Sequence, residues 1–208
     1  MDLRIAWRNL WRNRRRTLVI VAAVTVGIWT LLFMTAFARG FMQESVDNAI
    51  ANMTGHIQIH AQGYVDDPGI EYAMPEDDET LGAIRESLPE SAIITRRVRV
   101  NTVITNPRHT YGATLIGSSW QDERAATFLG EASLEGEALQ TGDSSGIVIG
   151  RALLDRFETE IGHKLILTTQ DSVGEITSRA FRIRGVFDAE LESTEKQFVF
   201  VNRSAAQD

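Results

Sequence analysis

The residues best suited to chemistry form the pentapeptide Gly142-Asp143-Ser144-Ser145-Gly146. It matches the G-x-S-x-G pattern of hydrolases, in which a serine nucleophile stands on a sharp turn between a strand and the helix that follows it. In this chain polar residues precede the pentapeptide, and a short β-branched run at 147–149 follows it. Because this order is the reverse of a nucleophile elbow, the sequence predicts a flexible turn. An exported hydrolase acting through Ser144 is a third alternative only.

Metal and nucleotide sites have even less support in the sequence. His56 and His60 are four residues apart, which suits a zinc pair on a helix, but on a strand this spacing is about 13 Å. Apolar and polar residues alternate over 57–61, which predicts a strand and therefore two surface histidines. The chain has two lysines, neither of which follows a glycine, so it holds no P-loop. We expect no catalytic, cofactor-binding or metal-binding residue in this chain.

Arginines are the remaining candidates for binding, and they fall into two groups. The first precedes a long apolar run and, with two tryptophans, would lie at a membrane interface, where guanidinium groups reach lipid phosphates. Its members are Arg4, Trp7, Arg8, Trp11, Arg12, Arg14, Arg15 and Arg16. The second group would meet an anionic substrate, a lipid headgroup or a partner, or else form an ordinary solvated strand face. Its members are Arg96, Arg97, Arg99 and Arg108.

An apolar run at residues 17–37 must position the first group. It has no ionisable side chain, and as a helix it would be about 31 Å long, close to the ~30 Å hydrocarbon core of a bilayer. Arginines before the run predict a cytoplasmic N-terminus, with everything after Phe37 outside. A cleaved signal peptide is the alternative, because Ala36-Phe37-Ala38 has the small-x-small form of a processing site. The run exceeds the usual signal-peptide core of about 7–15 residues, which favours an uncleaved membrane helix.

Residues on both sides of the run predict a longer element. Before it, Trp7-Arg8-Asn9-Leu10 is nearly repeated as Trp11-Arg12-Asn13, which predicts an amphipathic cytoplasmic elbow helix at 1–16; a merely basic flank is the alternative. After it, apolar residues recur at helical spacing up to Met53, which predicts a stalk helix at 38–54 with Gly55 as its stop. The predicted order is therefore an elbow, a transmembrane helix, a stalk and an extracytoplasmic domain at 55–208.

The domain at 55–208 is predicted to be mixed α+β, because strands and helices interleave without the regular long crossovers of a doubly wound sheet. Its size suits one large domain or two small subdomains. The predicted strands are 57–61, 92–105, 110–117, 147–149, 164–168, 179–187 and 197–201, and the predicted helices are 76–88, 121–128 and 151–157, with a loop at 62–75.

Charge and cysteine content limit the possible partners. The first 37 residues hold six arginines against Asp2, a net charge of +5, so the total of −7 leaves −12 for the rest of the chain. This acidic balance argues against a nucleic-acid partner. The chain has no cysteine, so its fold contains no disulfide and it is not a lipoprotein modified at an N-terminal cysteine.

The motif Trp7-Arg8-Asn9-Leu10-Trp11-Arg12-Asn13-Arg14-Arg15-Arg16-Thr17 resembles the cytoplasmic elbow that opens permease subunits of the FtsX-like, MacB-like ABC transporter family. Further segments, in the family's order, look like strands of its extracytoplasmic core domain. They are Tyr111-Gly112-Ala113-Thr114-Leu115-Ile116-Gly117, Ile147-Val148-Ile149-Gly150, Ile161-Gly162-His163-Lys164-Leu165-Ile166-Leu167, Phe181-Arg182-Ile183-Arg184-Gly185-Val186-Phe187 and Phe198-Val199-Phe200-Val201.

This resemblance implies an α+β fold of the MacB-like periplasmic core type and the N-terminal half of a permease in the bacterial inner membrane. It implies that ATP and Mg²⁺ are bound by a separate ABC ATPase subunit, that a second permease chain pairs with this one, and that the stalks carry motion to the external domains. The substrate would be a hydrophobic or amphipathic molecule such as a lipoprotein, lipid, peptide or drug.

One connection departs from the family's pattern. The lipoprotein-releasing permease that recruits a periplasmic carrier has a long hairpin between the strands matching 164–168 and 179–187, whereas here only residues 169–178 join them. Recruitment of a carrier by such a hook is therefore not expected. The alternative to a permease is a membrane-anchored extracytoplasmic sensor or interaction domain, which needs the same helix and orientation; further apolar spans after Asp208 would distinguish the two.

Overall fold

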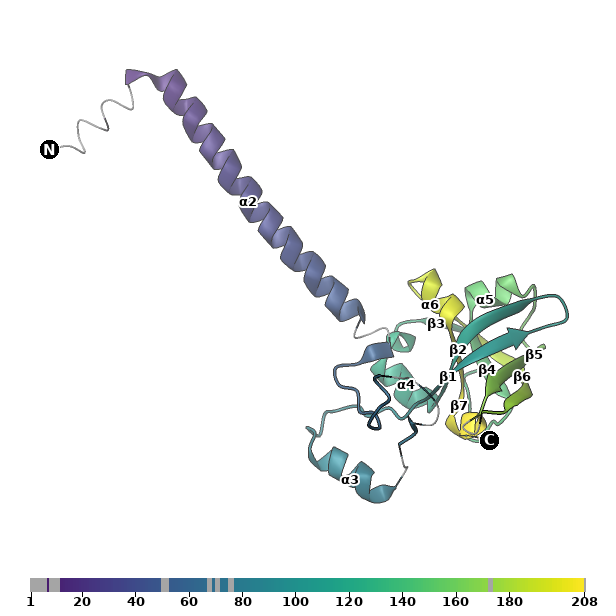
Figure 1. Ribbon diagram of the computed structural model, residues 1–208. Helices are drawn as coiled ribbons and strands as arrows, with labels where there is room; N and C mark the ends of the chain where they lie inside the picture. Colours follow the sequence, from purple (N-terminus) through teal and green to yellow (C-terminus); the bar gives the residue numbers. More distant parts are fainter. Residues whose placement is uncertain are drawn as a thin grey trace. The chain divides into compact units, whose positions relative to one another are not determined.

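A computed structural model describes residues 7, 12–49, 53–66, 69, 72–74, 77–171 and 174–207. The chain forms two compact units, which divide between Asn48 and Ala49 (Figure 1). The longest described element of the first unit is one long helix, and the second unit is the folded α+β unit. Each is described here by itself.

Helix α2 (Arg14–Ala49) runs for 36 residues without interruption. The predicted membrane helix and most of the predicted stalk are thus one element, because no glycine turn or proline interrupts the helical pattern between them. Hydroxyl groups of Thr30 and Thr35 donate to carbonyl oxygens four residues earlier, both at 2.8 Å, which satisfies these polar groups within the helix. Most of the predicted elbow helix, including Arg4, Arg8 and Trp11, lies outside the described residues.

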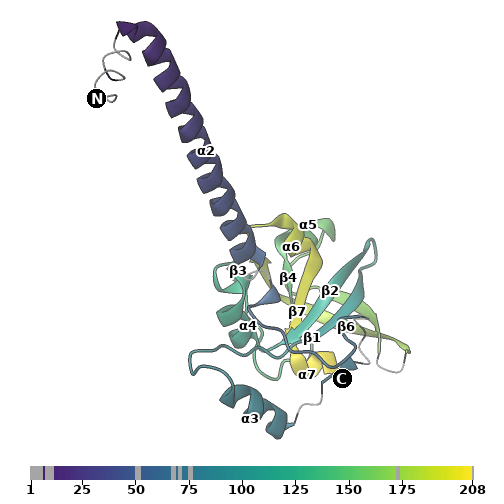
Figure 2. The same ribbon diagram turned by 60° about the vertical axis from the view of Figure 1, so that its left-hand side comes forward.

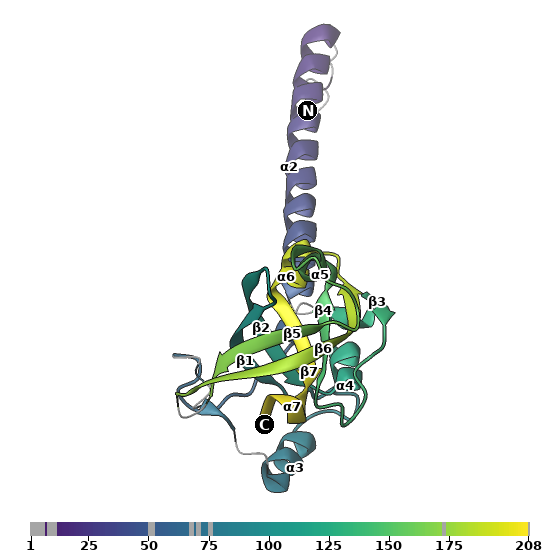
Figure 3. The same ribbon diagram turned by 90° about the vertical axis from the view of Figure 1, so that its right-hand side faces the viewer.

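Seven strands form the sheet of the folded unit (Figures 1 and 3). They are β1 (Val98–Thr105), β2 (Thr110–Ser118), β3 (Ser133–Gly136), β4 (Gly146–Gly150), β5 (Lys164–Gln170), β6 (Ile176–Asp188) and β7 (Phe198–Asn202). Their order is β3-β6-β4-β7-β2-β1-β5, and β5 also pairs with β6. Six strands therefore close into a small barrel, and β3 extends it along the end of the long strand β6. The pairs β2–β7 and β4–β6 are parallel, and the other pairs are antiparallel.

Short helices cover the barrel. Helices α5 (Arg151–Arg156) and α6 (Glu192–Gln197) lie at one end, and α7 (Arg203–Gln207) lies at the other end beside β2 and β7 (Figure 2). Helix α4 (Trp120–Ala126) is followed by a short 3-10 turn, η3 (Phe128–Gly130). Helix α3 (Asp78–Glu86) is capped by Asp77, whose carboxylate accepts from the Thr80 N–H at 2.6 Å.

Strands β4 and β7, and β2 from Ala113 onward, are buried on both faces. Alternate residues such as Ile147, Ile149 and Val199 point into the barrel and form the first core cluster. Their neighbours on the opposite face, such as Val148 and Phe200, form a second cluster with Trp120 of α4 and Leu129 of η3. The aromatic rings of the second cluster meet edge-on or tilted, for example Phe187 and Phe200 with centroids 5.6 Å apart.

The mixed α+β class is confirmed, and the strands predicted around 110–117, 147–149, 164–168, 179–187 and 197–201 are present. The predicted strand at 57–61 is wrong. Its residues pair with no described strand, and Ile57 and Ile59 are 70% and 50% exposed. Residues 92–97 likewise lie outside β1. Strand β3 and helices α6 and α7 were not predicted.

Gly150, at the junction of β4 and α5, is required by a close approach of two backbones. A Cβ atom there would overlap the carbonyl oxygen and Cα of Glu195, which as backbone atoms cannot turn aside. We expect Gly150→Ala to lower the free energy of unfolding by about 1–3 kcal/mol or more, because overpacking forces the backbone to shift. Urea unfolding followed by circular dichroism measures this.

Gly112 in β2 provides the matched control, since a Cβ there would meet no atom within 4 Å. Gly112→Ala is expected to leave stability unchanged or raise it slightly. Equal urea midpoints for the two variants would contradict the assigned packing of Gly150.

Candidate functional site

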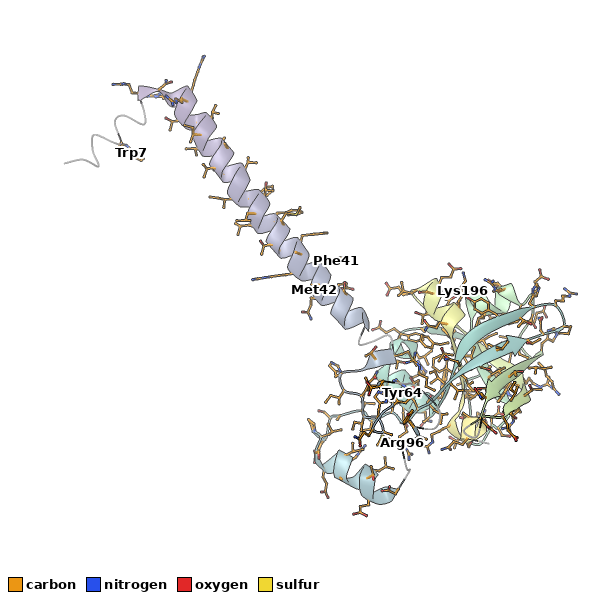
Figure 4. All side chains as sticks on the ribbon, in the orientation of Figure 1. Trp7, Phe41, Met42, Tyr64, Arg96 and Lys196 are labelled. Atoms are coloured by element: carbon orange, nitrogen blue, oxygen red, sulfur yellow. The ribbon has the colours of Figure 1, made fainter. Side chains whose placement is uncertain are left out.

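The first candidate site is the exposed apolar surface of α2. Residues Arg14–Ser45 have the length and composition needed to cross a membrane, and none of their apolar window is buried. Side chains stand out on every side of this helix, among them Phe41 and Met42 (Figure 4). A helix that is apolar all round and unburied has the character of a membrane span.

The arginines of the predicted interface group lie where this surface begins. Arg12, Arg14, Arg15 and Arg16 are all exposed, and Trp7 is 65% exposed. Arg4, Arg8 and Trp11 lie outside the described residues. The described members thus place a dense positive charge just before the apolar surface, which is the arrangement that fixes the orientation of a membrane helix.

The second arginine group does not form one site. Arg96 and Arg99 are exposed near the start of β1, and Figure 4 shows Arg96 on the segment that leads into it. Arg108 lies in the turn after β1, far from Arg96 and Arg99, because residues 99 and 105 of the strand are already about 20 Å apart. Arg108 pairs with Glu158 at 3.3 Å, and both line a surface hollow of about 420 Å³ with His163 and Lys164.

Arg97 differs from its neighbours because its guanidinium group is bonded inside the folded unit. Its Nε donates to both carboxylate oxygens of Glu123, at 2.9 and 3.0 Å, and its Nη2 lies 2.7 Å from Oε1. Its Nη1 donates to the carbonyl oxygen of Met53 at 2.8 Å. Arg97 is therefore held by the protein itself, although the sequence pattern alone groups it with Arg96 and Arg99.

The partners of Arg97 are buried. The Glu123 side chain is fully buried on α4, and Met53 is 7% exposed within the second core cluster. The backbone of Met53 has a φ of 96°, which side-chain-bearing residues rarely adopt. This arrangement was not predictable from the sequence, because Glu123 lies in an ordinary acidic pair with Asp122. Arg97 is 26 residues from Glu123 and 44 residues from Met53.

The pentapeptide at 142–146 is a turn, as predicted. The Asp143 carboxylate accepts from the Ser145 N–H at 3.0 Å and from Nε of Arg184 at 2.9 Å. Partial burial raises the pKa of Asp143, but these hydrogen bonds and the Arg184 charge outweigh it, so the pKa lies below its ordinary value. The aspartate thus fastens the turn to β6 and does not orient a nucleophile.

The histidines behave as surface residues. His56 and His60 are exposed; Nε2 of His60 lies 2.9 Å from Oε1 of Gln58, and its ring stacks on Tyr64 with centroids 4.5 Å apart. Among the described residues, no group of three or more His, Cys, Asp or Glu side chains could hold a metal ion.

Arg151 of α5 forms ion pairs with Glu135 of β3 and, at 3.1 Å, with Asp188 at the end of β6. It thereby joins three elements. The pKa of Asp188 is lowered, chiefly by the hydrogen bond from Arg151. Burial opposes this effect, and the Ser133 hydroxyl and the Arg151 charge add to it. A carboxyl with a lowered folded-state pKa stabilises the protein above its unfolded pKa of about 3.9, and this contribution disappears as the pH falls through the folded-state pKa.

We therefore expect Asp188→Asn to unfold at a lower urea concentration than the unsubstituted chain at pH 7. The difference between the two should shrink steadily as the pH is lowered from about 5 through the acid range. Urea midpoints measured at several pH values test this, and a difference that stays constant down to the lowest pH would contradict a stabilising role for the ionised carboxylate.

Comparison with known proteins gives a family match over almost the whole chain. A family model described as the MacB-like periplasmic core domain matches residues 17–208. No curated protein sequence matches the chain. The extracellular domain of YknZ, a noncanonic ABC-type transporter from Gram-positive bacteria, is 10% identical with a TM-score of 0.44, over 62% of this chain and 64% of that one. A domain of a permease protein from Porphyromonas gingivalis is 13% identical with a TM-score of 0.34, over 59% and 51%. The chain thus spans less than two thirds of either structure.

Proposed function

The chain belongs to the MacB-like periplasmic core domain family, a noncatalytic domain of ABC transporter permeases, and from this premise we propose that it is the N-terminal part of a permease subunit in a bacterial inner membrane. The family match carries the proposal, because it includes α2 from residue 17 onward as well as the folded unit. The proposed segments are a cytoplasmic elbow at 1–16, a membrane helix at 17–37, a stalk at 38–54 and an extracytoplasmic domain at 55–208.

The proposed orientation has the N-terminus in the cytoplasm and the folded unit outside. It is supported by the four described arginines before the apolar surface, against the single basic residue, Arg39, among residues 38–49 that follow it on α2. The elbow arginines and tryptophans would contact lipid headgroups on the cytoplasmic side. The acidic balance of the remaining chain supports a partner other than nucleic acid.

In the proposed transporter, ATP and Mg²⁺ are bound by a separate ABC ATPase subunit and two permease chains pair in the membrane. The uninterrupted helix α2 supports a mechanical role, since a continuous helix can pass a displacement along its axis without a hinge. The substrate would be hydrophobic or amphipathic, taken from the outer face of the membrane. Arg96, Arg99 and Arg108 are the arginines proposed to meet it or a partner.

Affinity purification of the complete permease from its native membrane tests the proposal. We expect an ABC ATPase to copurify, and an environment-sensitive fluorophore at an engineered Ser193→Cys on α6 to respond to ATP. An ATPase variant that binds ATP without hydrolysing it is the control. If no ATPase copurifies and ATP leaves the fluorophore unchanged, the permease proposal fails and the membrane-anchored sensor replaces it.

A further inference from the structure

We propose that the surface hollow beside the turn between β1 and β2 binds a phosphate group, held by Arg108, His163 and Lys164. The hollow has a volume of about 420 Å³. It is lined by residues 106–108, 158–159 and 163–164. The inference rests on the role proposed above for Arg108 and names its ligand. It involves neither the membrane helix nor an ATPase, so it can hold or fail separately from the assignment as a permease.

The fold brings the two sides of this hollow together. Strands β1 and β5 pair so that Thr105 lies opposite Ile166, which places the turn after β1 beside the residues that begin β5. Asn106 fixes this turn, because its Oδ1 accepts from two backbone N–H groups of the turn, at 3.0 and 2.7 Å. Its Nδ2 donates to the carbonyl oxygen of Phe157 at 2.7 Å. The turn that carries Arg108 is therefore fastened to the end of α5.

Two nitrogen groups at the hollow are available to a ligand. The Lys164 ammonium forms no ion pair with any residue that the structure describes, whereas Lys196, the other lysine of the chain, lies 2.6 Å from Glu192. Nδ1 of His163 lies 3.2 Å from the Thr159 hydroxyl, which orients the ring. Within the described ranges, Nε2 of that ring has no hydrogen-bond partner. Both groups suit an anionic ligand.

Glu158 occupies a position that usually holds glycine. It follows the end of α5 with a φ of 46°. The N–H groups of Glu158 and Thr159 donate back to the carbonyl oxygens of Asp155 and Leu154, at 3.1 and 3.3 Å. This is the Schellman ending of a helix, in which glycine avoids the steric cost of a positive φ. A glutamate here bears that cost, and such an outlier points to a use for its carboxylate.

The Glu158 carboxylate is shared between two distant partners. Its Oε2 lies 3.3 Å from Nη1 of Arg108 and 3.8 Å from Nε2 of His109. That Nε2 is shielded from solvent and has no hydrogen-bond partner in the part of the chain that the structure describes. A phosphate that takes the guanidinium would release the carboxylate toward His109, whose Nε2–H would then have an acceptor. Glu158 is therefore a positioning residue, which holds Arg108 at the hollow until a ligand arrives.

A phosphate group matches this set of donors. Its oxygens accept several charge-assisted hydrogen bonds at once, from the fork of an arginine and from the point charge of a lysine. A carboxylate offers two oxygens to the three nitrogen-bearing side chains, whereas a phosphate ester offers three. Inorganic phosphate and the headgroup of a lipid share this chemistry, and the experiment below distinguishes the two sources.

Histidine NMR spectra of the complete chain in a maltoside detergent test the site. Carbon-13 labelling of the rings gives two reporters at the hollow, His109 and His163, and two outside it, His56 and His60. We expect inorganic phosphate, added at constant pH and ionic strength, to shift the first pair saturably and to leave the second pair unchanged. Glycerol 3-phosphate, a lipid headgroup without acyl chains, is titrated in parallel. Tighter binding of glycerol 3-phosphate assigns the site to a lipid headgroup, and tighter binding of inorganic phosphate assigns it to the free ion.

Charge removal makes the result specific. Arg108→Ala/Lys164→Ala removes two exposed cations and is expected to weaken phosphate binding by about tenfold or more. Lys196→Ala, which removes the other lysine, should leave the affinity unchanged. Equal shifts of all the histidines, or an unaltered affinity in the double variant with native circular dichroism, would overturn the site. Because no ATPase takes part, either outcome leaves the permease proposal standing.

The role of Glu158 is tested in the same titration. Glu158→Gln removes the acceptor that competes for Arg108, so phosphate should bind about threefold more tightly or better. The shift of His109 should shrink, because no carboxylate turns toward it, while the shift of His163 remains. Glu160→Gln, which neutralises an exposed acid two residues further on, should keep the full shift of His109. A full His109 shift in Glu158→Gln would overturn the exchange of partners.

Discussion

Glu123→Ala is expected to lower the free energy of unfolding of the folded unit by about 3–5 kcal/mol. The substitution leaves the guanidinium of Arg97 in a site where its main acceptors have gone, and only 22% of the Arg97 side chain is exposed to solvent. An uncompensated charge in such a site costs far more than the pair contributes, because the ion has lost water without gaining a partner. Urea unfolding of the chain in detergent, followed by circular dichroism, measures the loss.

Two variants make this result specific. Asp122→Ala removes the adjacent carboxylate, which is exposed, and should cost well under 1 kcal/mol as a small change in charge near the first turn of α4. Arg97→Met/Glu123→Leu should recover most of the stability lost in Glu123→Ala, because it removes the stranded charge. A double variant as unstable as the single one would show that packing around the pair, and not the charge, determines the loss.

Ile28→Asp is expected to make membrane insertion of α2 less favourable by about 3 kcal/mol, a change of roughly a hundredfold in the insertion equilibrium. Ile28 lies near the centre of the predicted span at 17–37, where an ionised side chain has no water and no partner on the exposed helix surface. The fraction of chain inserted, measured with engineered glycosylation sites on either side of the helix, reports the change.

The same substitution beyond the apolar run is the control. Gln43→Asp lies on the same helix but after the predicted span at 17–37, so insertion should be unchanged within experimental error. Equal effects at positions 28 and 43 would contradict the placement of the span, and no effect at either position would contradict insertion of α2 altogether.

Local features of the fold were predictable because they depend on short-range patterns. The uncharged run at 17–37 predicted most of α2, and the strands predicted at 92–105 and 110–117 include the hairpin of β1 and β2, in which Thr105 pairs with Thr110. The alternation at 57–61 misled because periodicity shows only that a segment could be a strand. Whether it becomes one depends on a partner strand, and residues 57–61 pair with no described strand.

Tertiary pairing also explains what the sequence could not show about the candidate sites. Arg97 has the same local surroundings as Arg96 and Arg99, yet it alone is bonded to Glu123, because only the fold brings α4 and residue 53 against it. The turn at 142–146 was predictable from the order of its neighbours, since the strand β4 follows it directly. The partner that fastens it, Arg184, lies 41 residues further along the chain.

Thiol labelling in spheroplasts tests most directly whether α2 carries the folded unit outside the cytoplasm. Because the chain has no cysteine, Ser193→Cys in α6 and Asn13→Cys before the apolar surface each provide a single reporter. The proposed topology predicts that a membrane-impermeant maleimide labels Ser193→Cys in intact spheroplasts, and labels Asn13→Cys only after the membrane is permeabilised. Labelling of Asn13→Cys in intact cells, with Ser193→Cys protected until lysis, would contradict it.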